Sequence, residues 1–165
     1  MPELSVVIIA GDADQRSILQ VLVDGTSVAR TAFTSSSYPV ATSDPIVQRV
    51  QSANPDVILV DIPADNASLA LHSIELLQQE VNKAAAFAVG SMSQPQVIVN
   101  AMRAGAREFI ERPTTTTDLL EAFVRLTTTQ RKVQQREETR GKVFTVVNAK
   151  GGSGATTVAV NLALA

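Results

Sequence analysis

The chain has 165 residues, a formal net charge of −2 and a pI of about 5.4. This balance gives no support to nucleic-acid or membrane-surface binding, which needs a basic face. The absence of cysteine excludes disulfides and thiol chemistry. The N-terminal apolar run, 4–10, lacks a basic leader and is too short for a signal peptide or a membrane span. We therefore expect a cytoplasmic protein without membrane insertion, and room for one domain and a little more.

Short apolar runs alternate with amphipathic stretches along the first 130 residues. The runs are rich in β-branched residues and are bounded by turn-forming residues, which is typical of strands. Val57–Val60 is the most apolar run and is expected at the centre of a sheet, whereas Val28–Thr34 carries polar residues and suits an edge. The five predicted strands are Leu4–Ala10, Val28–Thr34, Val57–Val60, Ala84–Val89 and Arg107–Glu111.

Apolar residues at helical spacing predict a helix after each strand. Asp44 followed by Pro45 favours a helix start, Gly105 a helix end, and Thr117-Asp118 is expected to cap the fifth helix. The predicted helices are Asp14–Val23, Ser43–Ala53, Ser68–Val81, Gln94–Gly105 and the stretch from Thr117 onward. The residues assigned to the apolar sides of the first and fifth helices are Ile18, Leu19, Leu22 and Val23, and Leu119, Leu120, Phe123, Val124 and Leu126.

Strands that alternate with helices predict crossover connections and a parallel sheet covered on both faces. The fold class is therefore α/β, with a doubly wound, five-stranded parallel sheet. Ligands of such folds bind at the carboxyl ends of the strands. The residues that follow those ends, and so are candidates for a site, are Gly11, Asp12, Asp61, Gly90, Ser91 and Arg112.

Asp61 directly follows the most apolar strand. Two interpretations remain open for it: a carboxylate that caps a turn or helix, or a functional carboxylate in the ligand crevice. Tyr38 lies in a serine-rich loop and is too isolated for nucleic-acid stacking, so we assign it no role.

Two segments carry a family resemblance. The run Pro55-Asp-Val-Ile-Leu-Val-Asp-Ile62 resembles the third strand and phosphoacceptor of response-regulator receiver domains, and Ala101–Pro113 resembles the segment around their fifth strand. The resemblance covers about the first 130 residues and implies a CheY-like (flavodoxin-like) fold. It also implies that Asp61 is the phosphoacceptor, that Phe109 is the switch aromatic, and that Arg112 replaces the lysine that pairs with the phosphoryl group.

The chain also departs from the receiver pattern. Receivers place an acidic pair after the first strand to hold Mg²⁺, but these positions fall on Ala10 and Gly11, with Asp12 the only nearby acid. Mg²⁺ usually takes more than one carboxylate, so Asp12 and Asp61 are expected to bind it weakly. The supporting hydroxyl falls on Gly90 or Ser91. The sequence therefore predicts an atypical receiver.

A glycine-rich loop follows a sixth predicted strand and opens an apolar helix, the context of a phosphate-binding loop; a glycine-rich turn is the alternative. The loop resembles the deviant Walker A motif of MinD/ParA-type ATPases, but Ala155 replaces the usual phosphate lysine. We expect ATP binding only in an intact parent protein. The resemblance assigns nucleotide binding to Lys150, Gly151, Gly152, Gly154, Thr156 and Thr157.

The predicted domains are a receiver-like domain over 1–130, a linker over 131–141 and the start of a P-loop ATPase domain over 142–165. The charges of the linker are interpreted as a solvated helix face, with a binding tail as the alternative. The apolar residues of 142–165 predict self-association through this tail.

A receiver-like domain joined to a deviant Walker A loop resembles the CpaE/TadZ family, whose members localise the assembly machinery of Tad-type pili. The resemblance implies a truncated member that is not itself an enzyme and that acts as a regulatory, protein-interaction module. Pilus-assembly or signalling proteins are its expected partners. Two alternatives remain: a phosphorylatable receiver that signals through Asp61, and ATPase activity in the intact parent.

Overall fold

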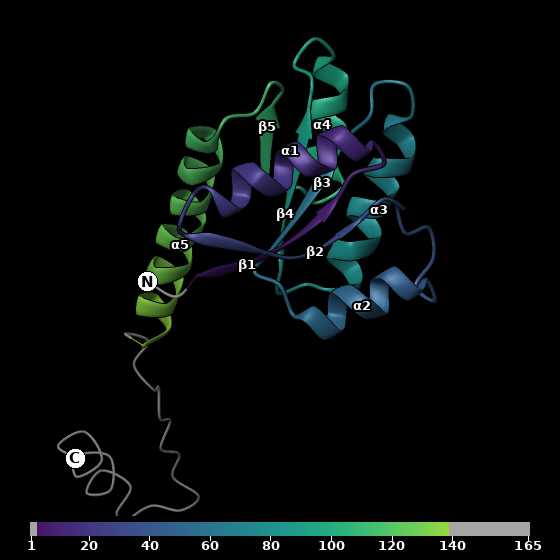
Figure 1. Ribbon diagram of the computed structural model, residues 1–165. Helices are drawn as coiled ribbons and strands as arrows, with labels where there is room; N and C mark the ends of the chain where they lie inside the picture. Colours follow the sequence, from purple (N-terminus) through teal and green to yellow (C-terminus); the bar gives the residue numbers. More distant parts are fainter. Residues whose placement is uncertain (1–2, 139–165) are drawn as a thin grey trace, which may run out of the picture. The chain divides into compact units, whose positions relative to one another are not determined.

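The structure, a computed structural model, describes residues 3–138, with side chains up to Thr129 (Figure 1). In this part of the chain five strands alternate with five helices, as the sequence predicts. The strands are β1 (Leu4–Ile9), β2 (Ala29–Ser35), β3 (Val57–Asp61), β4 (Ala85–Gly90) and β5 (Glu108–Glu111). The helices are α1 (Ala13–Asp24), α2 (Pro45–Ala53), α3 (Ala67–Glu80), α4 (Pro95–Arg103) and α5 (Thr116–Glu138).

All strand pairs are parallel, and the strand order is β2-β1-β3-β4-β5. The central position of β3 and the edge position of β2 are therefore confirmed. Register pairs Asp61 with Val89 across β3 and β4, and Gly90 with Glu111 across β4 and β5. The carboxyl ends of the strands consequently lie together at one edge of the sheet, where the site is expected.

Two apolar clusters cover the two faces of the sheet. Alternate strand residues such as Val6 and Ile8 pack with α1 and α5, while Val7 and Ile9 pack with α2, α3 and α4. Every residue of β3 is buried, as expected for a central parallel strand with helices on both sides. Asp61, the last residue of β3, thus follows a strand that is packed on both faces.

Several helix boundaries match the prediction. Asp44 caps α2, because its carboxylate accepts a hydrogen bond of 2.9 Å from the N–H of Ile46, and Pro45 begins the helix. Gly105 follows α4 with a φ of +104°, a left-handed conformation that favours glycine at a helix end.

The predicted cap of α5 is right for Asp118 and wrong for Thr117. The helix begins at Thr116, and Thr115 caps it together with Asp118. The Asp118 N–H donates to the Thr115 hydroxyl at 3.2 Å, and the Thr115 N–H donates to the Asp118 carboxylate at 2.9 Å. This reciprocal pair is a capping box, and the prediction placed it two residues too late because Thr114 to Thr117 are all threonine.

Two residues assigned to apolar helix sides are exposed. Ile18 of α1 is 51% exposed and Val124 of α5 is 48% exposed, whereas Leu19 and Phe123 beside them are buried. Each lies one residue off the buried stripe, so the apolar runs in these helices are wider than the faces that pack.

Within the described residues no helix is both long and apolar enough to cross a membrane.

The chain divides into two compact units, Met1–Thr128 and Thr129–Ala165. The sheet and its carboxyl edge belong to the first unit. The predicted strand, P-loop and helix of residues 142–165 lie outside the described residues and stay a prediction.

Candidate functional site

Asp61 is the last residue of β3, and only 2% of its surface is exposed. Its Oδ1 lies 3.2 Å from Nη2 of Arg112, whose side chain is 31% exposed. The same nitrogen donates a hydrogen bond to the carbonyl of Ile62, and the backbone N–H of Arg112 donates to the Gly90 carbonyl at 2.9 Å. The two residues therefore lie at one edge of the sheet, as the sequence predicts, and the arginine contacts the carboxylate itself. The expected pairing of Arg112 with a phosphoryl group stays a prediction.

Burial sets the charge state of Asp61. Burial raises its pKa from the ordinary 3.8 to about 6, the Arg112 guanidinium opposes this rise, and the nearby Asp12 carboxylate adds to it. Oδ1 accepts no hydrogen bond from any described residue, so its contact with Arg112 is an ion pair without hydrogen-bond alignment. Asp61 is therefore a buried carboxylate that one cation only partly compensates.

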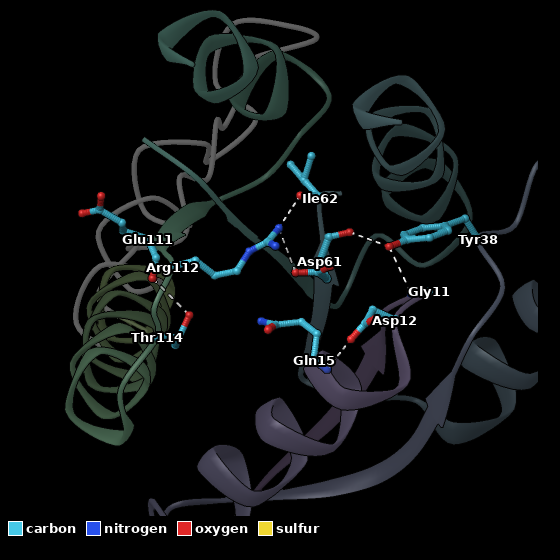
Figure 2. A network of polar contacts seen from close by, with 9 residues as sticks. All are labelled: Gly11, Asp12, Gln15, Tyr38, Asp61, Ile62, Glu111, Arg112 and Thr114. Atoms are coloured by element: carbon cyan, nitrogen blue, oxygen red, sulfur yellow. Dashed lines mark hydrogen bonds and ion pairs between the residues drawn. The ribbon is translucent and has the colours of Figure 1, made fainter. Parts of the chain in front are cut away.

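Tyr38, to which the sequence assigned no role, is part of this site. Its hydroxyl donates to the Asp61 carbonyl at 2.8 Å and accepts from the Gly11 N–H at 3.2 Å, so it bridges the ends of β3 and β1. Figure 2 shows Tyr38 and Arg112 approaching Asp61 from opposite sides. The sequence carried one signal for this role, which is position: Tyr38, the single tyrosine of the chain, follows the carboxyl end of an edge strand.

Tyr38→Phe is expected to lower the free energy of unfolding by about 1 kcal/mol, because the carbonyl of the buried Asp61 would lose its hydrogen-bond donor, whereas the exposed Gly11 N–H can bind water instead. Urea unfolding monitored by circular dichroism measures this change. Ser36→Ala, in the loop that carries Tyr38, is the control. Phe33→Leu on β2 would be a poor control, because the Phe33 ring lies against the Arg49 guanidinium. A Tyr38→Phe protein as stable as the parent would show that the bridge contributes nothing.

The Asp12 carboxylate is not part of a preformed metal-binding site among the described residues. It is the exposed N-cap of α1, and its Oδ1 accepts a hydrogen bond of 2.7 Å from the N–H of Gln15. No three His, Cys, Asp or Glu side chains among the described residues are grouped so as to hold a metal ion. With a guanidinium already beside Asp61, the described residues fit a resident Mg²⁺ poorly, since Mg²⁺ requires several oxygen ligands. Weak Mg²⁺ binding by Asp12 and Asp61 stays a prediction.

The hydroxyl position after β4 is also altered. A side chain added to Gly90 would place its Cβ 2.9 Å from Cζ of Phe109, so the aromatic ring occupies the space that this glycine leaves open. Ser91 is exposed, and its hydroxyl lies 2.8 Å from that of Ser93. Ser91 and Arg112 nevertheless line the same pocket of about 200 Å³ between the β3–α3 and β4–α4 loops.

The structure thus brings Asp12, Asp61, Ser91, Phe109 and Arg112 to one edge of the sheet. Their roles as phosphoacceptor, metal ligands and supporting groups stay predictions. The nucleotide-binding residues expected from Lys150 to Thr157 lie outside the described residues.

Solved structures share this architecture. A pilus assembly protein (cpaE) from Burkholderia thailandensis superposes with a TM-score of 0.64 at 23% identity, over 76% of this chain and 98% of that one. The described part of the chain has the receiver fold. A CheY-like protein (tadZ) from Pseudomonas aeruginosa gives 0.60 at 18% identity, over 75% and 99% of the two chains. A response regulator from Thermotoga maritima gives 0.61 at 14% identity, over 76% and 98%.

At these identities the likeness shows the fold alone. No protein-family model matches the chain, and no curated protein matches it. The CheY-like receiver fold predicted from the sequence is confirmed, and pilus-assembly proteins are among the structures that share it. Function must be argued from the receiver's own residues.

Proposed function

We propose that this receiver domain is a regulatory, protein-interaction module of a cytoplasmic pilus-assembly localisation protein and that it does not work by phosphoryl transfer. The observation that carries the proposal is the state of Asp61, a buried carboxylate held by Arg112 of the same chain. The shared fold with the cpaE and tadZ proteins supports the pilus-assembly context.

The geometry argues against easy attack by Asp61 on a phosphodonor. A nucleophilic carboxylate must present an oxygen to the donor, and cations must neutralise the negative charge that gathers there. Oδ1 of Asp61 is buried and faces Arg112, so the nearest cation is bound to the carboxylate before any donor arrives. Asp12, the second carboxylate of the edge, is engaged as a helix cap.

A phosphorylatable receiver is the second candidate, and one observation favours it. Arg112 and Ser91 line one pocket beside Asp61, so a phosphoryl group on Asp61 would find a guanidinium and a hydroxyl within reach. This candidate needs Asp61 to exchange its contact with Arg112 for one with the donor. It also needs a divalent cation at Asp12 and Asp61.

Phosphorylation distinguishes the two candidates. The full chain is incubated with Mg²⁺ and acetyl phosphate, a small phosphodonor, and its intact mass is followed by mass spectrometry beside the Asp61→Asn variant. We expect no phosphoryl adduct that depends on Asp61. An adduct on the parent chain that is absent from Asp61→Asn would favour the phosphorylatable receiver. A typical receiver treated in parallel shows that the donor is active.

ATPase activity of an intact parent is a third, separate expectation. It depends on the loop from Lys150 to Thr157, and the described residues neither support nor weaken it.

A further inference from the structure

The pocket of about 200 Å³ at the carboxyl edge of the sheet is mainly apolar. Its lining comes from the β3–α3 loop and the start of α3, from the β4–α4 loop and the start of α4, and from Arg112. Ile62, Ala67 and Val97 are among its apolar side chains. Pockets for drug-sized molecules measure about 300–1,000 Å³, so this one suits a smaller ligand, of about five carbon atoms.

Arg112 is the one charged residue among the described residues that line this pocket. Its Nη2 donates to the Ile62 carbonyl and pairs with Asp61, as Figure 2 shows. Its Nε is buried without a hydrogen-bond partner, and no described residue accepts a hydrogen bond from Nη1. A guanidinium carries five N–H donors in a planar fork that matches a carboxylate. Arg112 therefore has donors left for an anionic ligand.

The two helices that begin at the pocket add to its positive potential. Asn66 and Gln94, the N-caps of α3 and α4, form no side-chain capping hydrogen bond, whereas Asp12 and Asp44 cap α1 and α2. The first N–H groups of α3 and α4 thus lack a side-chain acceptor at their N-caps, and helix N-termini favour negative charge. These helix ends support the attraction of an anion that Arg112 provides.

We propose that this pocket binds a small organic carboxylate with an apolar body. The ligand carboxylate pairs with Arg112, and its carbon chain packs on Ile62, Ala67 and Val97. Inorganic phosphate suits the pocket less, because its walls are mainly apolar and Pro63 has no N–H to donate. The inference rests on the proposed function and names the input to the module, since a phosphoryl group on Asp61 would need the same guanidinium.

An amide NMR titration of the full chain with 3-methylbutanoate tests the proposal. We expect saturable shifts of the amides of Ala64, Ala67, Ser93 and Val97, with a Kd on the order of 1 mM. Three control ligands are 3-methylbutanamide, which lacks the charge, acetate, which lacks the apolar chain, and inorganic phosphate. Each should bind at least about tenfold more weakly.

Variants separate the charge from the cavity. Ala67→Leu fills the pocket without touching Arg112 and should weaken binding at least about tenfold. Asp61→Asn removes the negative charge that competes for Arg112, so it should strengthen binding at least about threefold. Asp61→Asn combined with Arg112→Met leaves no unpaired buried charge and should abolish binding in a folded chain. Arg107→Met, at an exposed position outside the pocket, is the control and should bind like the parent.

The inference is overturned if 3-methylbutanoate causes no saturable shift, if any of the three control ligands binds as tightly, or if the double variant still binds. Equal binding by Ala67→Leu, or weaker binding by Asp61→Asn, would also overturn it. The titration reports occupancy of the pocket, whereas intact mass reports a covalent adduct on Asp61. Each proposal can therefore fail without the other.

Discussion

Asp61→Asn is expected to raise the free energy of unfolding at pH 7.5 by about 2 kcal/mol. The pKa of Asp61 is about 6 in the folded chain, above its ordinary 3.8. A carboxyl whose folded pKa is raised binds more protons in the folded state between these two values, so its contribution to stability falls as pH rises through this window. The full shift corresponds to about 3 kcal/mol at neutral pH, and loss of the Arg112 contact reduces the expected gain.

The pH dependence separates this cause from others. Near pH 4 most folded molecules carry Asp61 protonated, so asparagine should give little advantage there. Urea unfolding of the parent and Asp61→Asn at pH 7.5 and pH 4 measures both gains. Glu75→Gln on the exposed face of α3 is the control, with an expected change within about 0.5 kcal/mol. A variant that is less stable at pH 7.5, or equally stabilised at both pH values, would contradict the account of a strained buried carboxylate.

Arg112→Met is expected to lower the free energy of unfolding by about 3 kcal/mol at pH 7.5. The substitution keeps a long apolar side chain but leaves the Asp61 carboxylate buried without its counter-ion, the costly half of a broken buried pair. It also removes the hydrogen bond to the Ile62 carbonyl. Because Arg112 lowers the pKa of Asp61, its loss raises that pKa further, and the cost should diminish at pH 5, where Asp61 binds a proton.

The double variant completes a thermodynamic cycle. Asp61→Asn in the Arg112→Met background should recover most of the lost stability, since no charge then remains buried. Arg112→Lys keeps the charge and should cost less than Arg112→Met. If the double variant is no more stable than Arg112→Met, the arginine stabilises the chain by packing, and the ion pair with Asp61 is not the reason.

The sequence was sufficient to predict the sheet and most of the residues at its carboxyl edge. β-branched runs locate the five strands, and the apolar character of Val57–Val60 predicts the central strand. Parallel strands place their following residues at one edge, which is why Asp61 and Arg112 could be predicted to meet although 51 positions separate them in the chain.

The rest depended on contacts between segments that no local pattern encodes. Tyr38 belongs to a loop after β2, and its bridge between Gly11 and Asp61 follows only from the twist of the sheet and the path of that loop. The contact of Phe109 with Gly90 likewise arises because β4 and β5 are neighbours. The apolar residues of α4 predict a helix with an apolar face. The sequence could not show that Val99 and Met102 lie outside the core.

The central claim is that Asp61 lies in a receiver fold but does not accept a phosphoryl group. A two-dimensional amide NMR titration of the full chain with Mg²⁺, and then with beryllofluoride as a phosphoryl mimic, tests it most directly. We expect Mg²⁺ to cause only small shifts that do not saturate at millimolar concentration, and beryllofluoride to add no shift in the amides of Asp12, Asp61, Ser91 and Arg112. Saturable shifts of these amides that disappear in Asp61→Asn would contradict the claim and establish a working phosphoacceptor site.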